Sequence, residues 1–175
     1  MIQRLKNFLA QRNRANWLLF VILASTIFMK CCLGHFFMHH SILVSSLWKQ
    51  PLYFWAFYLP KISISLLLAS FVFLLKRKWP LIILSILIDI WIWANIIYFR
   101  IYGGVIDGYV LMMAGNLKGF TSSIISIIEW KDLCFLLLTI LFAAIILWLK
   151  EIERRSSMRF GIVFLSACLF WIGST

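Results

Sequence analysis

Long apolar runs alternate with short basic clusters along almost the whole chain. A transmembrane helix needs about 20 mainly apolar residues, with a range of about 17 to 25. The runs therefore predict five transmembrane helices, at about residues 17–37, 52–75, 81–99, 133–149 and 160–175. The expected fold class is an all-α integral membrane protein in which residues 17–175 form one membrane domain.

Residues 100–132, between the third and fourth runs, follow a different pattern. Apolar residues recur there at spacings of three and four, which gives one apolar stripe on a helix and predicts one or two interfacial amphipathic helices. The stripe consists of Ile106, Tyr109, Val110, Met113, Leu117, Phe120 and Ile124. Glycines such as Gly103 and Gly104 permit sharp turns at the start of this loop.

The composition excludes a water-soluble globule, because 63% of residues are hydrophobic, 13% are charged and the mean hydropathy is +0.97. The net charge of +11 comes from short clusters between the apolar runs. Such clusters are topology signals, and they do not form a face that follows nucleic-acid phosphates. The four cysteines have no CxxC spacing, so we expect neither a disulfide framework nor a zinc site.

Residues 1–16 contain four basic residues and no acidic one. Their apolar residues fall on one side of a short helix, so we expect a cytoplasmic interfacial segment. A cleaved signal peptide is the alternative, but no small-x-small cleavage site follows the first run, and Lys30 occupies the place where a lipidation box needs a small residue. We expect an uncleaved first span with Lys30 near its outer end, where its stem can snorkel.

Basic residues set the orientation. With five spans and the amino terminus inside, 11 of the 17 basic residues lie on cytoplasmic segments. A sixth span through residues 105–128 would move the cluster at 150–159 outside and would carry Asp107, Asn116 and Lys118 through lipid. The sequence therefore predicts a multi-pass protein of the bacterial cytoplasmic (inner) membrane, with the carboxyl terminus outside.

Besides Lys30 near the end of the first span, two charges fall inside the predicted spans: Lys61, beside Pro60, and Asp89. If spans two and three form an antiparallel hairpin, a rise of about 1.5 Å per residue places them roughly 14 and 15 Å below the outer surface. We expect a structural intramembrane pair between Lys61 and Asp89, direct or through water, because an unpaired acid in hydrocarbon is costly. A substrate or proton pathway is the alternative.

Cys31, His35 and His39 are spaced four apart and would form a stripe on a continuing helix. A metal site needs further ligands and supporting hydrogen bonds, and the sequence offers neither. We expect an interfacial histidine cluster and no metal.

Several elements together carry a family resemblance: Asn95-Ile-Ile-Tyr98-Phe-Arg100, Gly115-Asn116, Ser123-Ile-Ile-Ser126-Ile-Ile and Asp132. With the five runs and the proline in the second, they resemble the membrane part of the lipoteichoic acid synthase family, which are sulfatase-like membrane proteins of the alkaline phosphatase superfamily. The resemblance covers residues 50–150 closely. Gly104 and Lys118 depart from it, since the synthases usually have an acid and a glycine there.

The resemblance implies a large extracytoplasmic domain in which a threonine and a manganese ion transfer glycerol phosphate from a phospholipid. The 175 residues contain no such domain, and no catalytic constellation replaces it. We therefore expect no cofactor and no catalysis in this chain alone, and a truncation before the catalytic domain. The expected partners are membrane lipids and a sulfatase-like domain, either following covalently or separate. Nucleic acid is not an expected partner.

The outer end of span three also suggests a lipid site. Guanidinium, amide and ammonium donors suit phosphate oxygens, so Arg100 with its neighbours could hold a lipid head group. The candidate residues are Asn95, Tyr98, Arg100, Asn116 and Lys118. Ordinary interfacial anchoring by Arg100 and the tyrosines is the alternative. For the whole chain, the alternatives to a membrane anchor are a small transporter and a membrane partner subunit.

Overall fold

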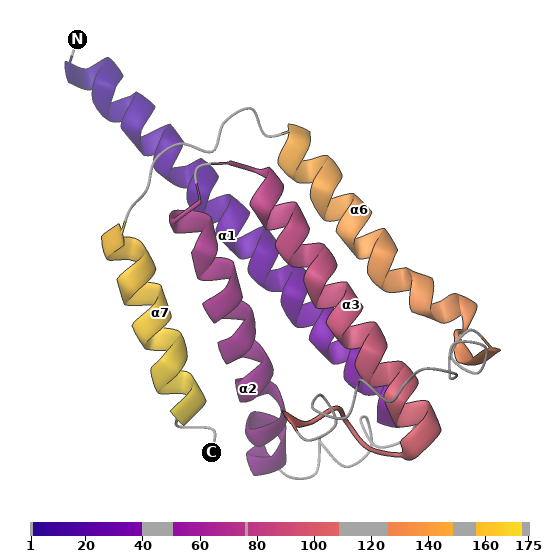
Figure 1. The fold of residues 1–175 in the computed structure, drawn as a ribbon. Coiled ribbons are helices and arrows are strands. Elements are labelled where there is room, and N and C mark those ends of the chain that lie inside the picture. The colour runs from indigo at the N-terminus through magenta and orange to yellow at the C-terminus, as the bar shows by residue number, and fades with distance from the viewer. Residues whose placement is uncertain (1, 40–50, 76, 109–125, 149–156, 173–175) are drawn as a thin grey trace.

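The computed structural model describes residues 2–39, 51–75, 77–108, 126–148 and 157–172. The described residues form α-helices and short 3-10 helices and no strand. The all-α prediction is therefore confirmed for this part of the chain. Figure 1 shows the helices as a bundle in which successive elements run in opposite directions, with the N and C labels at opposite ends.

Helix α1 spans Ile2–His39 without a break. The short amino-terminal helix expected over residues 1–16 is thus the first part of a longer helix, and Figure 1 shows that part projecting beyond the bundle. Residues Asn16–Met38 are apolar and long enough to cross a bilayer. The first predicted span is therefore present.

Helix α2, Pro51–Ala69, contains Pro60 and continues into a 3-10 turn, η1, at Ser70–Phe73. Helix α3 then covers Trp79–Tyr102. Its start suits Pro80, which loses no helical hydrogen bond in the first turn. Its end is set by Gly103, whose φ of 72° lies in the left-handed region that glycine adopts without steric cost.

The short 3-10 turn η3, Trp130–Asp132, leads into α6, Leu133–Trp148, and α7 covers Ser157–Ile172. Helices thus lie at all five predicted positions. By length and apolarity, three described segments are long enough to cross a membrane: Asn16–Met38, Trp79–Tyr102 and Trp130–Trp148. The apolar segments Phe57–Phe73 and Arg159–Leu169 are shorter, so five complete crossings stay a prediction.

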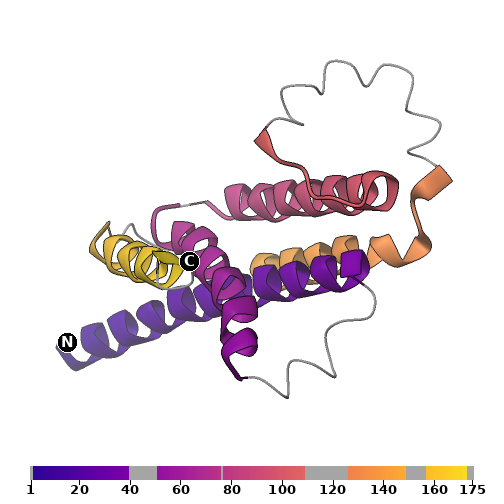
Figure 2. The ribbon, with the colours of Figure 1, turned by 90° about the horizontal axis from the view of Figure 1, so that it is seen from below.

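Helix α1 is the centre of the bundle. It packs against α2, α3 and α6, while α7 packs against α2 and η1. Figures 1 and 2 show α1, α3 and α6 side by side. The main core gathers apolar side chains from these elements: Leu19, Leu23, Ile27, Val72, Phe73, Leu81, Phe142, Ile146 and Val163.

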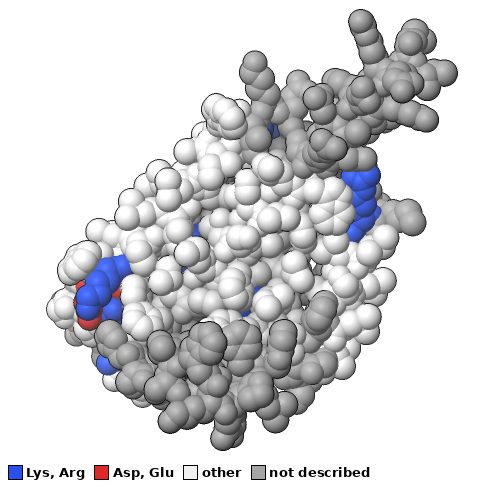
Figure 3. All heavy atoms as spheres, turned by 180° about the vertical axis from the view of Figure 1, so that it is seen from behind, with Lys and Arg blue, Asp and Glu red and all other residues white. Residues whose placement is uncertain are grey.

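The outer faces of the helices are apolar too. Leu137 and Leu141 on α6 are each 60% exposed, and Ile90 on α3 is 57% exposed. Most of the described surface in Figure 3 is white, so it carries neither basic nor acidic side chains. A contiguous apolar surface of this kind suits contact with lipid chains.

The amphipathic helices predicted between Arg100 and Asp132 fall largely on residues 109–125, which lie outside the described residues. The described start of this loop, Gly103–Asp107, contains no helix.

Candidate functional site

A fully buried lysine joins three helices. Lys30 on α1 has no exposed surface, and its ammonium nitrogen lies 2.7 Å from Asp89 Oδ1 on α3. It also donates to Ser85 Oγ at 2.8 Å and to Thr139 Oγ1 on α6 at 2.5 Å. Thr139 in turn donates to Asp89 Oδ2. The charged groups are thus paired and hydrogen-bonded, as charges in hydrocarbon must be.

This network corrects two expectations. Lys30 does not snorkel to the surface, since Asp89 and two hydroxyl groups hold its ammonium inside the bundle. The predicted ion pair between Lys61 and Asp89 is wrong, because the cationic partner of Asp89 is Lys30.

The physical reason is the position of α1. The depth argument assumed that α2 and α3, joined by a short turn, pack against each other as a hairpin. In the structure, α1 packs against both helices and supplies its own lysine to Asp89. The Lys61 ammonium instead donates to the Phe57 carbonyl at 2.9 Å and lies 3.2 Å above the centre of the Phe57 ring.

Sequence reasoning missed Lys30, Ser85 and Thr139 as members of this network. One signal was available: Ser85 and Asp89 are four residues apart and share a helix face. Lys30 lies seven residues before the end of the first predicted span, which is about 10 Å below the surface. Asp89 lies a few ångströms deeper, so the long side chain of Lys30 could reach it. Depth alone did not choose between the two lysines.

A second polar cluster lies where the two ends of the 100–132 loop meet. The guanidinium of Arg100, at the end of α3, donates to both carboxylate oxygens of Asp132 at 2.8 and 2.9 Å. It also donates to the carbonyl of Ile127 at 3.0 Å. Planar two-point pairing of this kind is strong and directional. Arg100 and Asp132 therefore bind the two ends of the 100–132 loop together, and we call this pair the loop clamp.

Neighbouring contacts hold the loop clamp in place. Asp132 Oδ2 accepts the backbone N–H of Glu129 at 2.9 Å, which caps η3. The Trp93 indole N–H donates to the Asp132 carbonyl at 2.8 Å. Asp132 is 2% exposed, so its charge depends on Arg100 and these donors.

The other candidate lipid residues have local partners or lie outside the described residues. Asn95 is buried, donates to the Trp91 carbonyl and accepts the N–H of Ile106 at 3.1 Å. Tyr98 stacks on Tyr102 with ring centres 4.6 Å apart. Asn116 and Lys118 lie outside the described residues. The structure thus brings Asn95 and Arg100 to one end of α3, where both organise the loop.

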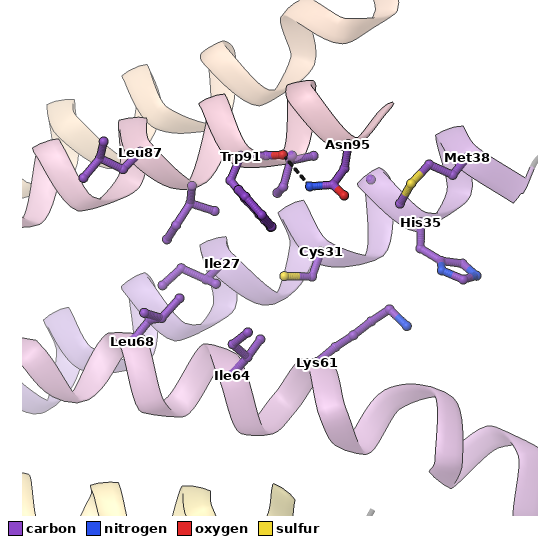
Figure 4. A pocket seen from close by; sticks show the side chains of 13 residues that line it. Ile27, Cys31, His35, Met38, Lys61, Ile64, Leu68, Leu87, Trp91 and Asn95 are labelled. Carbon is purple, nitrogen blue, oxygen red and sulfur yellow. Dashed lines mark hydrogen bonds between the residues drawn. The ribbon is translucent and has the colours of Figure 1, made fainter. Parts of the chain in front are cut away.

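A cavity of about 460 Å³ lies between α1, α2 and α3. Figure 4 shows Ile27, Leu68 and Leu87 at one end, and Lys61, His35 and Asn95 toward the other. The deep end is thus apolar, and the polar side chains gather at the end nearer the 100–132 loop. Asp89 and Lys30 do not line this cavity.

The cysteine and histidine stripe does not assemble into a site within the described residues. The His35 ring packs edge-on against the Phe57 ring, with ring centres 4.5 Å apart, and Cys31 is a free thiol. The side chain of His39 and all of His40 lie outside the described part. Where the structure describes side chains, no three histidine, cysteine or acidic residues are close enough to hold a metal.

The comparison with known families agrees with the apolar helices of the described bundle. The model of the lipoteichoic acid synthase N-terminal domain matches residues 2–175. No solved structure matches the chain. Since the family match extends over nearly every residue, the resemblance at residues 50–150 is confirmed and extends to both ends. The chain belongs to the family of lipoteichoic acid synthase N-terminal domains.

Proposed function

We propose that these residues form the membrane anchor of a lipoteichoic acid synthase-like transferase whose sulfatase-like catalytic domain lies outside them. The observation that carries the proposal is the family match over residues 2–175. The apolar helices supply the anchor, and their exposed faces meet lipid. In this proposal the catalytic domain either follows these residues in the same protein or is encoded separately.

The first test is membrane retention together with the DNA beyond codon 175. The chain should stay with membranes after alkaline carbonate extraction, as an integral protein does. A sulfatase-like reading frame should continue in frame or lie just downstream. Extraction by carbonate would contradict the anchor. An unrelated downstream gene would favour a transporter or a subunit of another complex.

The proposed orientation places the amino terminus in the bacterial cytoplasm and the carboxyl terminus outside. The support is the basic-residue bias, with Lys78 and its neighbours inside. An alkaline phosphatase reporter, which folds only outside the cytoplasm, should be active when fused after Thr175 and inactive when fused after Lys78. The reverse pattern would overturn the orientation.

Lipid-head-group contact by Asn95, Tyr98, Arg100, Asn116 and Lys118 is the finer part of the proposal. Arg100 has five N–H donors, and three described hydrogen bonds use part of them. A lipid phosphate would therefore share the guanidinium with Asp132. In the complete enzyme, R100K should lower activity more than K131Q, which removes a half-exposed charge beside Glu129. Equal effects of R100K and K131Q would contradict head-group contact by Arg100.

A further inference from the structure

The cavity between α1, α2 and α3 carries a cation that has no acidic partner among the described residues. Lys61 lines it, and the contacts of its ammonium are the Phe57 carbonyl and the Phe57 ring. Among the described residues, no Asp or Glu forms an ion pair with Lys61. Lys30, on the adjacent helix α1, differs from Lys61. Its ammonium pairs with Asp89 and donates to the hydroxyl groups of Ser85 and Thr139, so it needs no ligand.

An unbalanced cation in an apolar region is costly and attracts an anion. The carbonyl and ring contacts of Lys61 orient its ammonium, but they supply only partial negative charge. A full negative charge at the polar end of the cavity would complete the site. A phosphate oxygen suits the Lys61 ammonium, because an ammonium has three donors and no acceptor.

The apolar lining of the rest of the cavity indicates that the anion carries an apolar group. Beyond Lys61, the lining is made by apolar side chains: Ile27, Ile64, Leu68, Leu87, Ile88 and Ile92. Figure 4 shows Ile27, Leu68 and Leu87 at the end of the cavity away from the Lys61 ammonium, so the charge and this apolar wall occupy opposite ends. A free phosphate would leave that wall bare, whereas an acyl chain would cover it. The volume of about 460 Å³ falls within the range of about 300 to 1,000 Å³ usual for small-ligand sites.

We propose that this cavity binds one acyl chain of an anionic glycerophospholipid, with the lipid phosphate at Lys61. The inference deepens the proposed function and rests on it, because the bundle must lie in a bilayer for a lipid to enter. It adds a lipid site distinct from the loop clamp, on a cation that no described carboxylate neutralises.

The test compares lipids retained by the purified 175-residue protein. The protein is placed in nanodiscs of phosphatidylcholine with a minor fraction of phosphatidylglycerol, extracted in mild detergent, and its bound lipids are identified by native mass spectrometry. The unaltered protein should retain phosphatidylglycerol in preference to phosphatidylcholine. K61M should lower that preference by about tenfold, the effect of losing one charge-assisted contact. K61R should keep it.

Two further variants separate this site from general charge attraction and from misfolding. K131Q removes a lysine that already has Glu129 as a partner, so it should leave lipid retention unchanged. L68W fills the apolar end and should lower retention while Lys61 stays in place. Glycerophosphoglycerol, the head group without acyl chains, should not displace the lipid.

Four results would overturn the inference: equal retention by K61M and unaltered protein, equal loss in K61M and K131Q, no effect of L68W, or displacement by the free head group. Carbonate extraction of the same variants keeps the two proposals distinguishable. K61M should remain integral to the membrane even where it loses the lipid. If the chain itself fails to stay in the membrane, the anchor proposal fails first.

Discussion

Lys30 depends wholly on its neighbours for solvation, since none of its surface is exposed. Removing Asp89 as D89N would leave a buried ammonium without its counter-ion. Breaking one side of such a pair costs about 3 to 5 kcal/mol, whereas replacing both sides by apolar groups costs far less. We expect D89N to lower the thermal unfolding midpoint in detergent strongly, and K30M with D89L to recover most of the loss. Equal losses in both variants would contradict the pairing.

The loop clamp is the second prediction at this scale. R100K keeps the charge but removes the planar two-point contact with Asp132. The loop ends should then open more often. We expect backbone amides around Gly103–Gly108 and at Glu129 to exchange hydrogen about tenfold faster. Unchanged exchange there would show that Trp93 and the capping contacts hold the loop without Arg100.

At the scale of single elements, the contact between α1 and α3 depends on one glycine. A Cβ on Gly34 would lie 2.9 Å from Ile92 Cγ2. Overpacking of this kind costs about 1 to 3 kcal/mol, against a gain of up to about 1 kcal/mol from better helix propensity. We expect G34A to lower the unfolding midpoint, and I92L with G34A to restore part of it, because leucine lacks the Cγ2 methyl that the new Cβ would meet.

Gly161 in α7 provides the matched control for this contact. A Cβ there meets nothing within 4 Å. G161A should therefore leave the midpoint unchanged or raise it, because only the helix-propensity gain remains. A lower midpoint for G161A than for G34A would contradict the packing argument.

At the scale of the whole molecule, the packing falls into two groups that the contact between α1 and α2 joins. Helices α1, α3 and α6 are joined by the Lys30 network, while α7 contacts α2 and η1. Removing α7 should therefore speed amide exchange in α2 and η1 and leave α3 and α6 protected, because local opening follows lost contacts. Uniform loss of protection would show one cooperative unit.

The sequence by itself determined the all-α class, the five helix positions and the family. These follow from run length, apolarity and local motifs, which act along one chain segment at a time. Gly103 and Pro80 also mark the ends of α3 through their own backbone geometry. The asymmetry of basic residues predicts an orientation for the same reason, because it needs only the order of runs and clusters.

Only the tertiary structure decided which charges meet. Spacing along a helix gives depth, but it does not give the direction in which a side chain points or the identity of the neighbouring helix. Lys30 and Lys61 had comparable depths, and the insertion of α1 beside α3 assigned Asp89 to Lys30. The same arrangement places Lys61 on a cavity that no Asp or Glu of the described residues lines. Which helices become neighbours depends on the packing of the whole bundle, so it cannot be predicted from any single run of residues.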